Sequence, residues 1–107
     1  MSLVRNAYLQ EIKDKKGQIQ KIVAKKFPQY PVEVRGGHDD SETVYIILYC
    51  VQKDAIDRTV DVLEELIEDM APIADYLMLM SLVKTPDCTQ EYYPEIYKIW
   101  ENMVQDK

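Results

Sequence analysis

Cysteine and histidine are scarce in this chain, whose 107 residues include two cysteines and one histidine. Two cysteines do not make the disulfide framework of a small secreted domain. We therefore expect Cys50 and Cys88 to be free thiols in a cytoplasmic protein. His38 lies among turn residues and lacks the neighbouring ligands that a zinc site requires, so turn chemistry explains it better than metal binding or acid–base catalysis does.

Long apolar runs are also missing. No stretch of about 18 apolar residues is present, which argues against a membrane-spanning segment, and no basic and apolar secretory signal opens the sequence. The length of 107 residues suits one domain, residues 1–107, with a core that needs no disulfide or metal. We expect no membrane partner.

The common catalytic and cofactor motifs are absent too. The sequence contains no phosphate-binding G-x-x-x-x-G-K-[ST], no dinucleotide-binding G-x-G-x-x-G, no nucleophile elbow G-x-S-x-G and no zinc-binding H-E-x-x-H. These absences favour a protein without catalytic residues, and we expect no cofactor.

Basic residues are few outside the N-terminal quarter. Residues 1–27 hold seven of the thirteen basic residues and two acids, a net charge of +5, whereas residues 28–107 sum to −11. An acidic body repels phosphates, so nucleic acid is an unfavourable main partner. A protein with a basic surface, or a second copy of the chain, fits this charge better.

What is present is organised around Thr43–Val51, a run of β-branched and aromatic residues without glycine, proline or charge. Successive side chains of a strand point to opposite faces, and in this run both faces are largely apolar. This predicts a central strand covered on both sides. Pro31–Arg35 alternates apolar and charged residues, and the turn residues 36–41 connect it to the main strand. We expect an antiparallel hairpin.

Helices are predicted on either side of this hairpin. Leu3–Lys26 has an apolar side that includes Ile12, Ile19 and Val23, a solvated lysine-rich side, and Gly17 as a point of bending or close packing. Gln52–Met70 is the clearest amphipathic helix, with Asp54 as its N-cap.

The segment Ile73–Lys84 is ambiguous between helix and strand. We predict a strand, parallel to the main strand, because it follows a strand and a helix, and we assign its methionines to the core. A last helix begins near Pro94. The predicted fold is α/β (α+β), a small three-stranded mixed sheet with three helices in the order α-β-β-α-β-α.

Acidic residues crowd one sector of the predicted helix Gln52–Met70, and this sector is the candidate partner-binding site: Asp57, Asp61, Glu64, Glu65 and Glu68. Like charges four residues apart destabilise a helix. The sector therefore either binds a basic partner, as in an adaptor or inhibitor, or is neutralised within the fold by the lysine-rich first helix. A homodimer, through the tyrosine face or by helix pairing, is a further alternative.

The order of elements over residues 8–84 resembles that of the minimal nucleotidyltransferases. Gly36-Gly37 would correspond to the Gly-Ser of that family, and Asp40, Glu42 and Asp75 to the metal-binding carboxylates. Glu42 and Val44 stand where the family has aspartates. Since two-metal phosphoryl chemistry needs closely spaced carboxylates, the resemblance implies an inactive relative.

Overall fold

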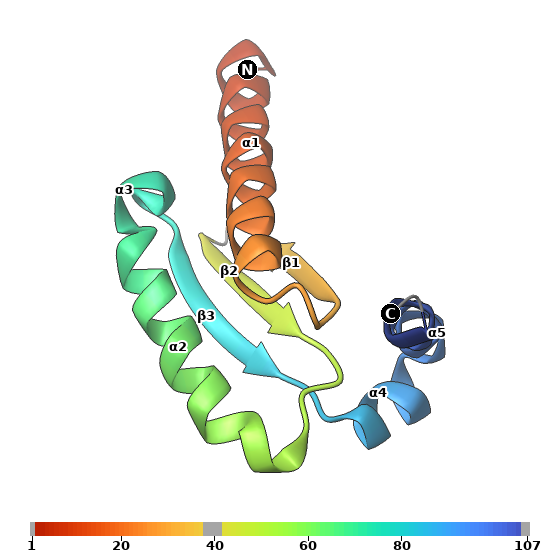
Figure 1. The fold of residues 1–107 in the computed structure, drawn as a ribbon. Coiled ribbons are helices and arrows are strands. Elements are labelled where there is room, and N and C mark those ends of the chain that lie inside the picture. Colours follow the sequence, from red (N-terminus) through yellow and green to blue (C-terminus); the bar gives the residue numbers. More distant parts are fainter. Residues whose placement is uncertain (1, 38–41, 106–107) are drawn as a thin grey trace.

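The computed structural model describes residues 2–37 and 42–105 (Figure 1). The elements follow in the order α1 (Ser2–Lys26), β1 (Val32–Gly36), β2 (Thr43–Leu48), the 3₁₀ turn η1 (Lys53–Ala55), α2 (Ile56–Asp69), α3 (Ala71–Ala74), β3 (Met78–Val83), α4 (Pro86–Tyr92) and α5 (Pro94–Gln105). The predicted fold class is confirmed. Within the described ranges there are five α-helices rather than the predicted three, because α3 and α4 are separate short helices.

The sheet has the order β1-β2-β3, so β2 is central as predicted. β1 pairs with β2 in the antiparallel sense, with Val34 opposite Ile46. β3 pairs with β2 in the parallel sense, with Met80 opposite Tyr45. The sheet is therefore mixed, and β1 and β3 are its two edge strands.

The prediction of a strand over Ile73–Lys84 is confirmed only from Met78 onwards. The Ala74 N–H donates to Met70 C=O and the Asp75 N–H to Ala71 C=O, so helical hydrogen bonding continues past the end of α2. Asp75 then adopts a φ of 55°, a left-handed conformation in which the chain leaves the helix. Ile73 and Ala74, the first residues of the predicted strand, therefore belong to the helical turn α3.

β2 ends at Leu48 rather than at the predicted Val51. The Lys84 N–H donates to Leu48 C=O, whereas the Val51 N–H donates to Lys84 C=O, so Tyr49 and Cys50 bulge out of the ladder. Cys50 has a φ of 64°, which few residues other than glycine adopt. The Tyr49 N–H donates to Pro31 C=O, which extends the antiparallel pairing with the β1 side by one residue.

The main core lies between one face of the sheet and the helices α1 and α2, and we call this side the covered face. Figure 1 shows α1 passing across β1 and β2 while α2 runs beside β3. Ile46 and Leu48 of β2 are fully buried there, together with Ile19 and Val23 of α1 and Leu63 of α2. The predicted apolar side of α1 is confirmed at Ile12, Ile19 and Val23.

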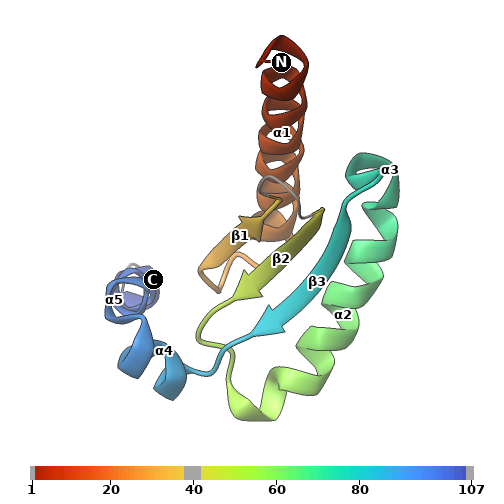
Figure 2. The same cartoon turned by 180° about the vertical axis from the view of Figure 1, so that it is seen from behind.

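The opposite side of the sheet, which we call the open face, differs from the prediction that both faces of β2 are covered. Figure 2 shows that no described helix lies across β2 and β3 on this side. Tyr45 is 40% exposed, Met78 61% and Met80 46%, so these two methionines are not core residues. Among the described residues, cover on this side is seen at the end of β2, where Ile47 packs with residues of α5 such as Ile96 and Trp100.

One local prediction for the helices is wrong, and two hold only in part. Asp54 lies inside η1 and does not cap α2, whose N-cap residue, Ala55, makes no side-chain capping hydrogen bond. A Cβ atom at Gly17 would meet nothing within 4 Å, so there is no close packing at this residue. The lysine side of α1 is also not purely solvated, since Lys15 Nζ donates to Ile73 C=O at 3.1 Å and Lys16 Nζ to Gly36 C=O at 2.8 Å.

None of the helices in the described ranges combines the length and the apolar character needed to cross a lipid bilayer.

Candidate protein-binding surface

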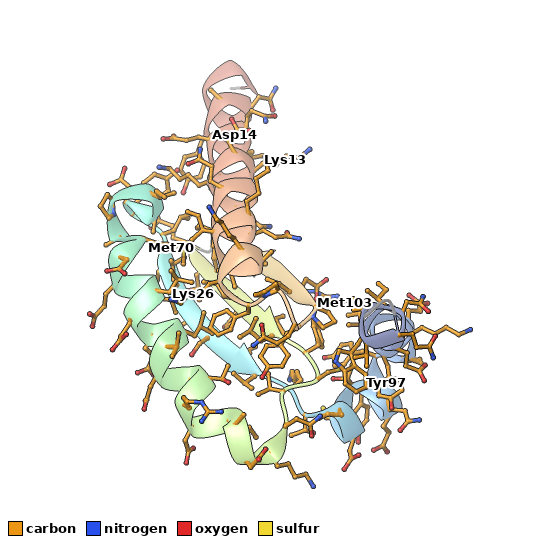
Figure 3. The ribbon with its side chains drawn as sticks, in the orientation of Figure 1. Lys13, Asp14, Lys26, Met70, Tyr97 and Met103 are labelled. Atoms are coloured by element: carbon orange, nitrogen blue, oxygen red, sulfur yellow. The ribbon has the colours of Figure 1, made fainter. Side chains whose placement is uncertain are left out.

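The acidic sector of α2 is set by the amphipathic sequence of the helix. Leu63 and Thr59 are buried against the rest of the fold, and Met70, directly after the helix, is 2% exposed. Residues on the opposite side point to solvent, and all five candidate site residues are exposed: Asp57, Asp61, Glu64, Glu65 and Glu68. We call these five residues the acidic sector. In Figure 3, oxygen-tipped side chains project from the outer side of α2.

No cation of the described chain pairs with the acidic sector. The ion pairs found between described residues join Lys15 to Glu11, Arg35 to Glu33 and Lys53 to Asp87, and none of these carboxylates belongs to α2. Lys15 and Lys16 of α1 are engaged with backbone carbonyls elsewhere, and Lys13 points away from α2 (Figure 3). Neutralisation by the lysine-rich helix is therefore not seen in the described structure.

A groove lies at the surface between α2 and β3, which pack together in the core. It has a volume of about 320 Å³ and is lined by residues of α2 and of β3: Glu64, Ile67, Glu68, Leu79, Met80 and Ser81. Two members of the acidic sector therefore border an apolar strand edge. The sequence could not reveal this juxtaposition, because it depends on β3 being the edge strand next to α2.

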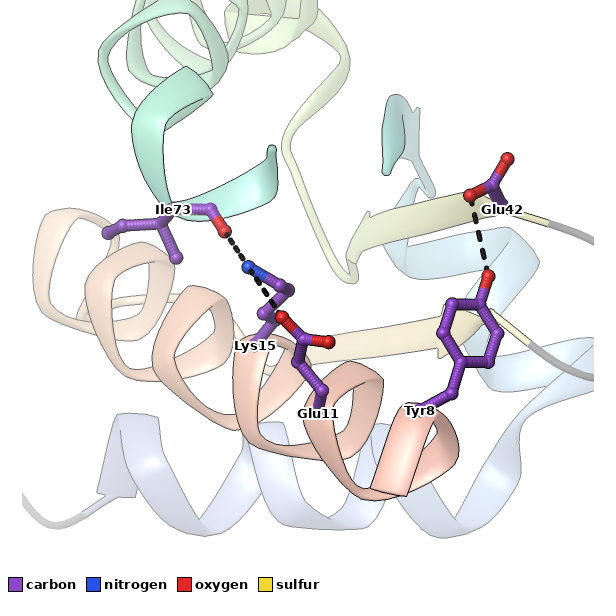
Figure 4. A network of polar contacts seen from close by, with 5 residues as sticks. All are labelled: Tyr8, Glu11, Lys15, Glu42 and Ile73. Atoms are coloured by element: carbon purple, nitrogen blue, oxygen red, sulfur yellow. Dashed lines mark hydrogen bonds and ion pairs between the residues drawn. The ribbon is translucent and has the colours of Figure 1, made fainter. Parts of the chain in front are cut away.

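A polar network joins α1 to the segments before β2 and β3 (Figure 4). The Tyr8 hydroxyl donates to Glu42 Oε2 at 3.4 Å, and the Tyr8 ring stacks on Tyr76 with 5.7 Å between ring centroids. Lys15 Nζ lies 5.6 Å from the centre of the Tyr76 ring and 3.9 Å from Glu11 Oε1. Burial, together with the charge of Glu42, raises the pKa of Tyr8. These contacts position α1 on the sheet.

The residues that carry the nucleotidyltransferase resemblance are found in this region. Glu42 accepts the hydrogen bond from Tyr8, while Asp75 is exposed at the end of α3. Asp40 and His38 lie outside the described residues. In the part of the chain that the structure describes, no three histidine, cysteine or carboxylate side chains are grouped so that they could hold a metal ion.

A separate polar contact lies on the opposite side of the sheet, on the open face. It involves Glu33, and the sequence analysis missed it. The Tyr49 hydroxyl donates to Glu33 Oε1 at 2.5 Å, and Arg35 Nε lies 2.9 Å from the same oxygen. Burial raises the pKa of Tyr49, and the hydrogen bond to Glu33 adds to the shift. The only sequence signal was Glu33 and Arg35 on the same side of one strand.

Both cysteines are free thiols, as predicted. Cys50 is buried, and burial raises the pKa of its thiol, which disfavours the nucleophilic thiolate. Cys88 is partly buried near the start of α4, where its N–H donates to the Thr85 hydroxyl.

Comparison of the chain with protein-family models, with curated proteins and with solved structures gave no match.

Proposed function

We propose that this protein is a non-catalytic interaction module, an adaptor or inhibitor, that binds the basic surface of a partner protein through the acidic sector of α2. One observation carries the proposal: five neighbouring carboxylates are exposed on one helix, and no cation of the described residues pairs with them. A partner that supplies lysine or arginine side chains would provide the missing counter-charges.

The local energetics of α2 support a role outside the fold. The helix contains four like-charge pairs at a spacing of four residues: Asp57–Asp61, Asp61–Glu65, Glu64–Glu68 and Glu65–Asp69. Each such pair destabilises a helix by about 0.2–0.5 kcal/mol. Glu65, Glu68 and Asp69 also lie near the C-terminal end, where the helix dipole disfavours anions. A surface that weakens its own helix is expected when binding, rather than folding, benefits from the charge.

Self-association is the second form of the same proposal, since α1 is basic and α2 is acidic. In this form the lysines of one copy would face the acidic sector of another copy, and a symmetric dimer would contain this contact twice. A dissociation that depends on salt would accompany this arrangement.

The test is a double charge reversal, Glu64→Lys/Glu68→Lys, with Glu91→Lys/Glu101→Lys as the matched control at exposed positions of α4 and α5. Both variants change the net charge equally. We expect the α2 variant to be at least as stable as the parent in thermal unfolding, because each new lysine lies three residues from Asp61 or Glu65. It should lose the basic proteins that the parent and the control variant both capture from lysate at low salt.

Sedimentation of the same three proteins separates the two forms. Dissociation of a dimer by the α2 reversal alone would assign the acidic sector to self-association. A variant that melts lower and captures the same proteins as the parent would overturn the proposal.

A further inference from the structure

The outer edge of β3 carries backbone groups without a strand partner. β3 pairs with β2 alone among the described strands. The Met78 N–H and the Lys84 N–H both point to β2, donating to Glu42 C=O and Leu48 C=O. Because backbone groups alternate between the two sides of a strand, the N–H and C=O groups of Leu79, Ser81 and Val83 point to the outer edge.

Within β3 itself, the features that usually protect an edge strand are missing. The sequence of β3, MLMSLV, contains no charge and no proline, and β3 has no bulge. α2 runs beside β3 but leaves the groove of about 320 Å³ along Leu79, Met80 and Ser81. An added strand would therefore find free main-chain donors and acceptors together with space under α2.

The two sides of an added strand would meet different chemistry. On the covered side, its side chains would enter the groove beneath Glu64 and Glu68. On the other side, its side chains would continue the apolar open face formed by Met78, Met80 and Leu82, which are all exposed. The site therefore favours a segment in which basic and apolar residues alternate.

The spacing of the two carboxylates agrees with this alternation. Glu64 and Glu68 are four residues apart on α2, which is about 6 Å along a helix axis. Alternate residues of a strand are about 6.7 Å apart and point to the same side. Two basic side chains at alternate positions of one strand would therefore face one carboxylate each.

We propose that the partner contributes an extended segment of alternating basic and apolar residues, which binds as a fourth strand at the outer edge of β3. The proposal rests on the proposed function, since the same acidic sector supplies the counter-charges. Main-chain hydrogen bonds to β3 supply affinity, and Glu64 and Glu68 select basic side chains at alternate positions.

Charge argues against a second copy as the added strand. Pairing of β3 with β3 of another copy would bring Glu64 and Glu68 of both copies close together. β3 has no basic residue that could neutralise these carboxylates. Like charges at this distance repel, whereas a basic segment is attracted.

The probe for the test is a fluorescein-labelled peptide of eight residues that alternates arginine and valine, titrated with the full chain and followed by anisotropy. The comparison peptide has four arginines followed by four valines, so its charge and composition are the same. Two further peptides carry backbone N-methyl groups on all arginines or on all valines, which removes one set of main-chain donors. The Glu64→Lys/Glu68→Lys and Glu91→Lys/Glu101→Lys variants are titrated in parallel.

We expect the alternating peptide to bind about tenfold or more tightly than the block peptide, because several main-chain hydrogen bonds are gained together. One N-methyl set should weaken binding about tenfold and the other should have little effect. Loss with methylated arginines indicates an antiparallel strand, and loss with methylated valines a parallel one. The α2 variant should bind weakly and with little salt dependence, whereas the control variant binds as the parent does.

The failures are distinguishable. If the block and alternating peptides bind equally and both depend on Glu64 and Glu68, the strand proposal is overturned and the proposed function stands. If binding is indifferent to the α2 reversal, both are overturned. If the free chain is a dimer that Ser81→Pro converts to a folded monomer, a second copy occupies the edge and the strand proposal is also overturned.

Discussion

The two faces of the sheet are built from similar residues but lie in different surroundings. On the covered face, Ile46 and Leu48 have no exposed area. On the open face, Tyr45, Met80 and Leu82 are each between 38% and 46% exposed, although these side chains are also largely apolar. Both faces belong to the same strands, so their difference comes from the helices that pack on them and not from the strands themselves.

Because of this difference, one face of the sheet stabilises the fold and the other leaves apolar surface free for binding. Residues on the covered face contribute by burial, at about 25 cal/mol for each Å² of apolar surface removed from water. The exposed residues of the open face, such as Met80 and Leu82, contribute much less to the fold and leave apolar surface next to an unpartnered strand edge. Large contiguous apolar patches of this kind mark interaction sites more often than scattered apolar residues do.

The sharpest test of the comparison uses one residue type on both faces. Leu48→Ala should destabilise the protein by about 2–5 kcal/mol, because Leu48 is fully buried and its removal leaves a cavity. Leu82→Ala should cost less than about 1 kcal/mol, since Leu82 is already 38% exposed. Urea unfolding followed by circular dichroism measures both. Equal losses would show that the open face is buried in solution.

A second test probes how tightly α1 closes the covered face. Gly37 has a φ of 70°, and a Cβ atom there would lie 2.8 Å from Ile12 Cγ2. Gly37→Ala should therefore cost about 1–3 kcal/mol through backbone strain and overpacking. Gly17→Ala is the matched change on the exposed side of α1, where the new methyl group meets nothing, and it should stabilise the helix by about 1 kcal/mol. Thermal unfolding of the pair should show shifts of opposite sign, and shifts of the same sign would contradict this account.

The third test concerns the part of the open face that α5 covers. The pKa of Tyr49 is raised in the fold, so the folded state holds the phenol proton more tightly than the unfolded state. This contribution is complete below the ordinary tyrosine pKa of about 10 and is lost as the pH rises towards the folded value. Tyr49→Phe should lower stability at neutral pH by about 1–2 kcal/mol, through loss of the hydrogen bond to Glu33.

The same variant should also lose less stability between about pH 9 and pH 11 than the parent does. Tyr45→Phe is the control, because Tyr45 is on the exposed part of the same face. Urea unfolding at a series of pH values gives the comparison. A parent and a Tyr49→Phe variant with the same pH profile would show that the Glu33 contact does not hold this proton.

The smallest expected effect is at Met78, which at 61% is more exposed than the other apolar residues of the open face, Tyr45, Met80 and Leu82. Met78→Lys should change the free energy of unfolding by no more than about 0.5 kcal/mol, because little apolar area is lost from the core. It should also reduce light scattering at high protein concentration by interrupting the apolar patch. A loss above about 2 kcal/mol would mean that another surface covers this residue.

The sequence allowed much of the fold to be predicted. Period-two alternation and β-branched residues identified β1 and β2, and the strand–helix order correctly implied that β3 is parallel to β2. The end of β2 was not predictable, because the bulge at Tyr49 and Cys50 depends on hydrogen bonds to Lys84, far along the chain. The missing cover of the open face depends on the position of α5, which no local periodicity specifies.

The candidate site was predictable in the same partial way. The helical wheel gave the acidic sector and its exposure, because side-chain direction in an amphipathic helix follows from spacing alone. The position of Glu64 and Glu68 beside an open strand edge required the strand order and the packing of α2 on β3. A long-range arrangement of this kind leaves no mark on a single sequence.

The mixed sheet also has a consequence for the order of folding. β1 and β2 are joined through the short segment 37–42, whereas residues 49–77 must be arranged before β3 can pair with β2. Loop closure and distant contacts slow the later pairing, so β3 is expected to complete the sheet last. Until then an uncharged apolar hexapeptide is exposed, which is an aggregation hazard. The carboxylates of α2 precede it in the chain, and their mutual repulsion between molecules would act as a gatekeeper during that interval.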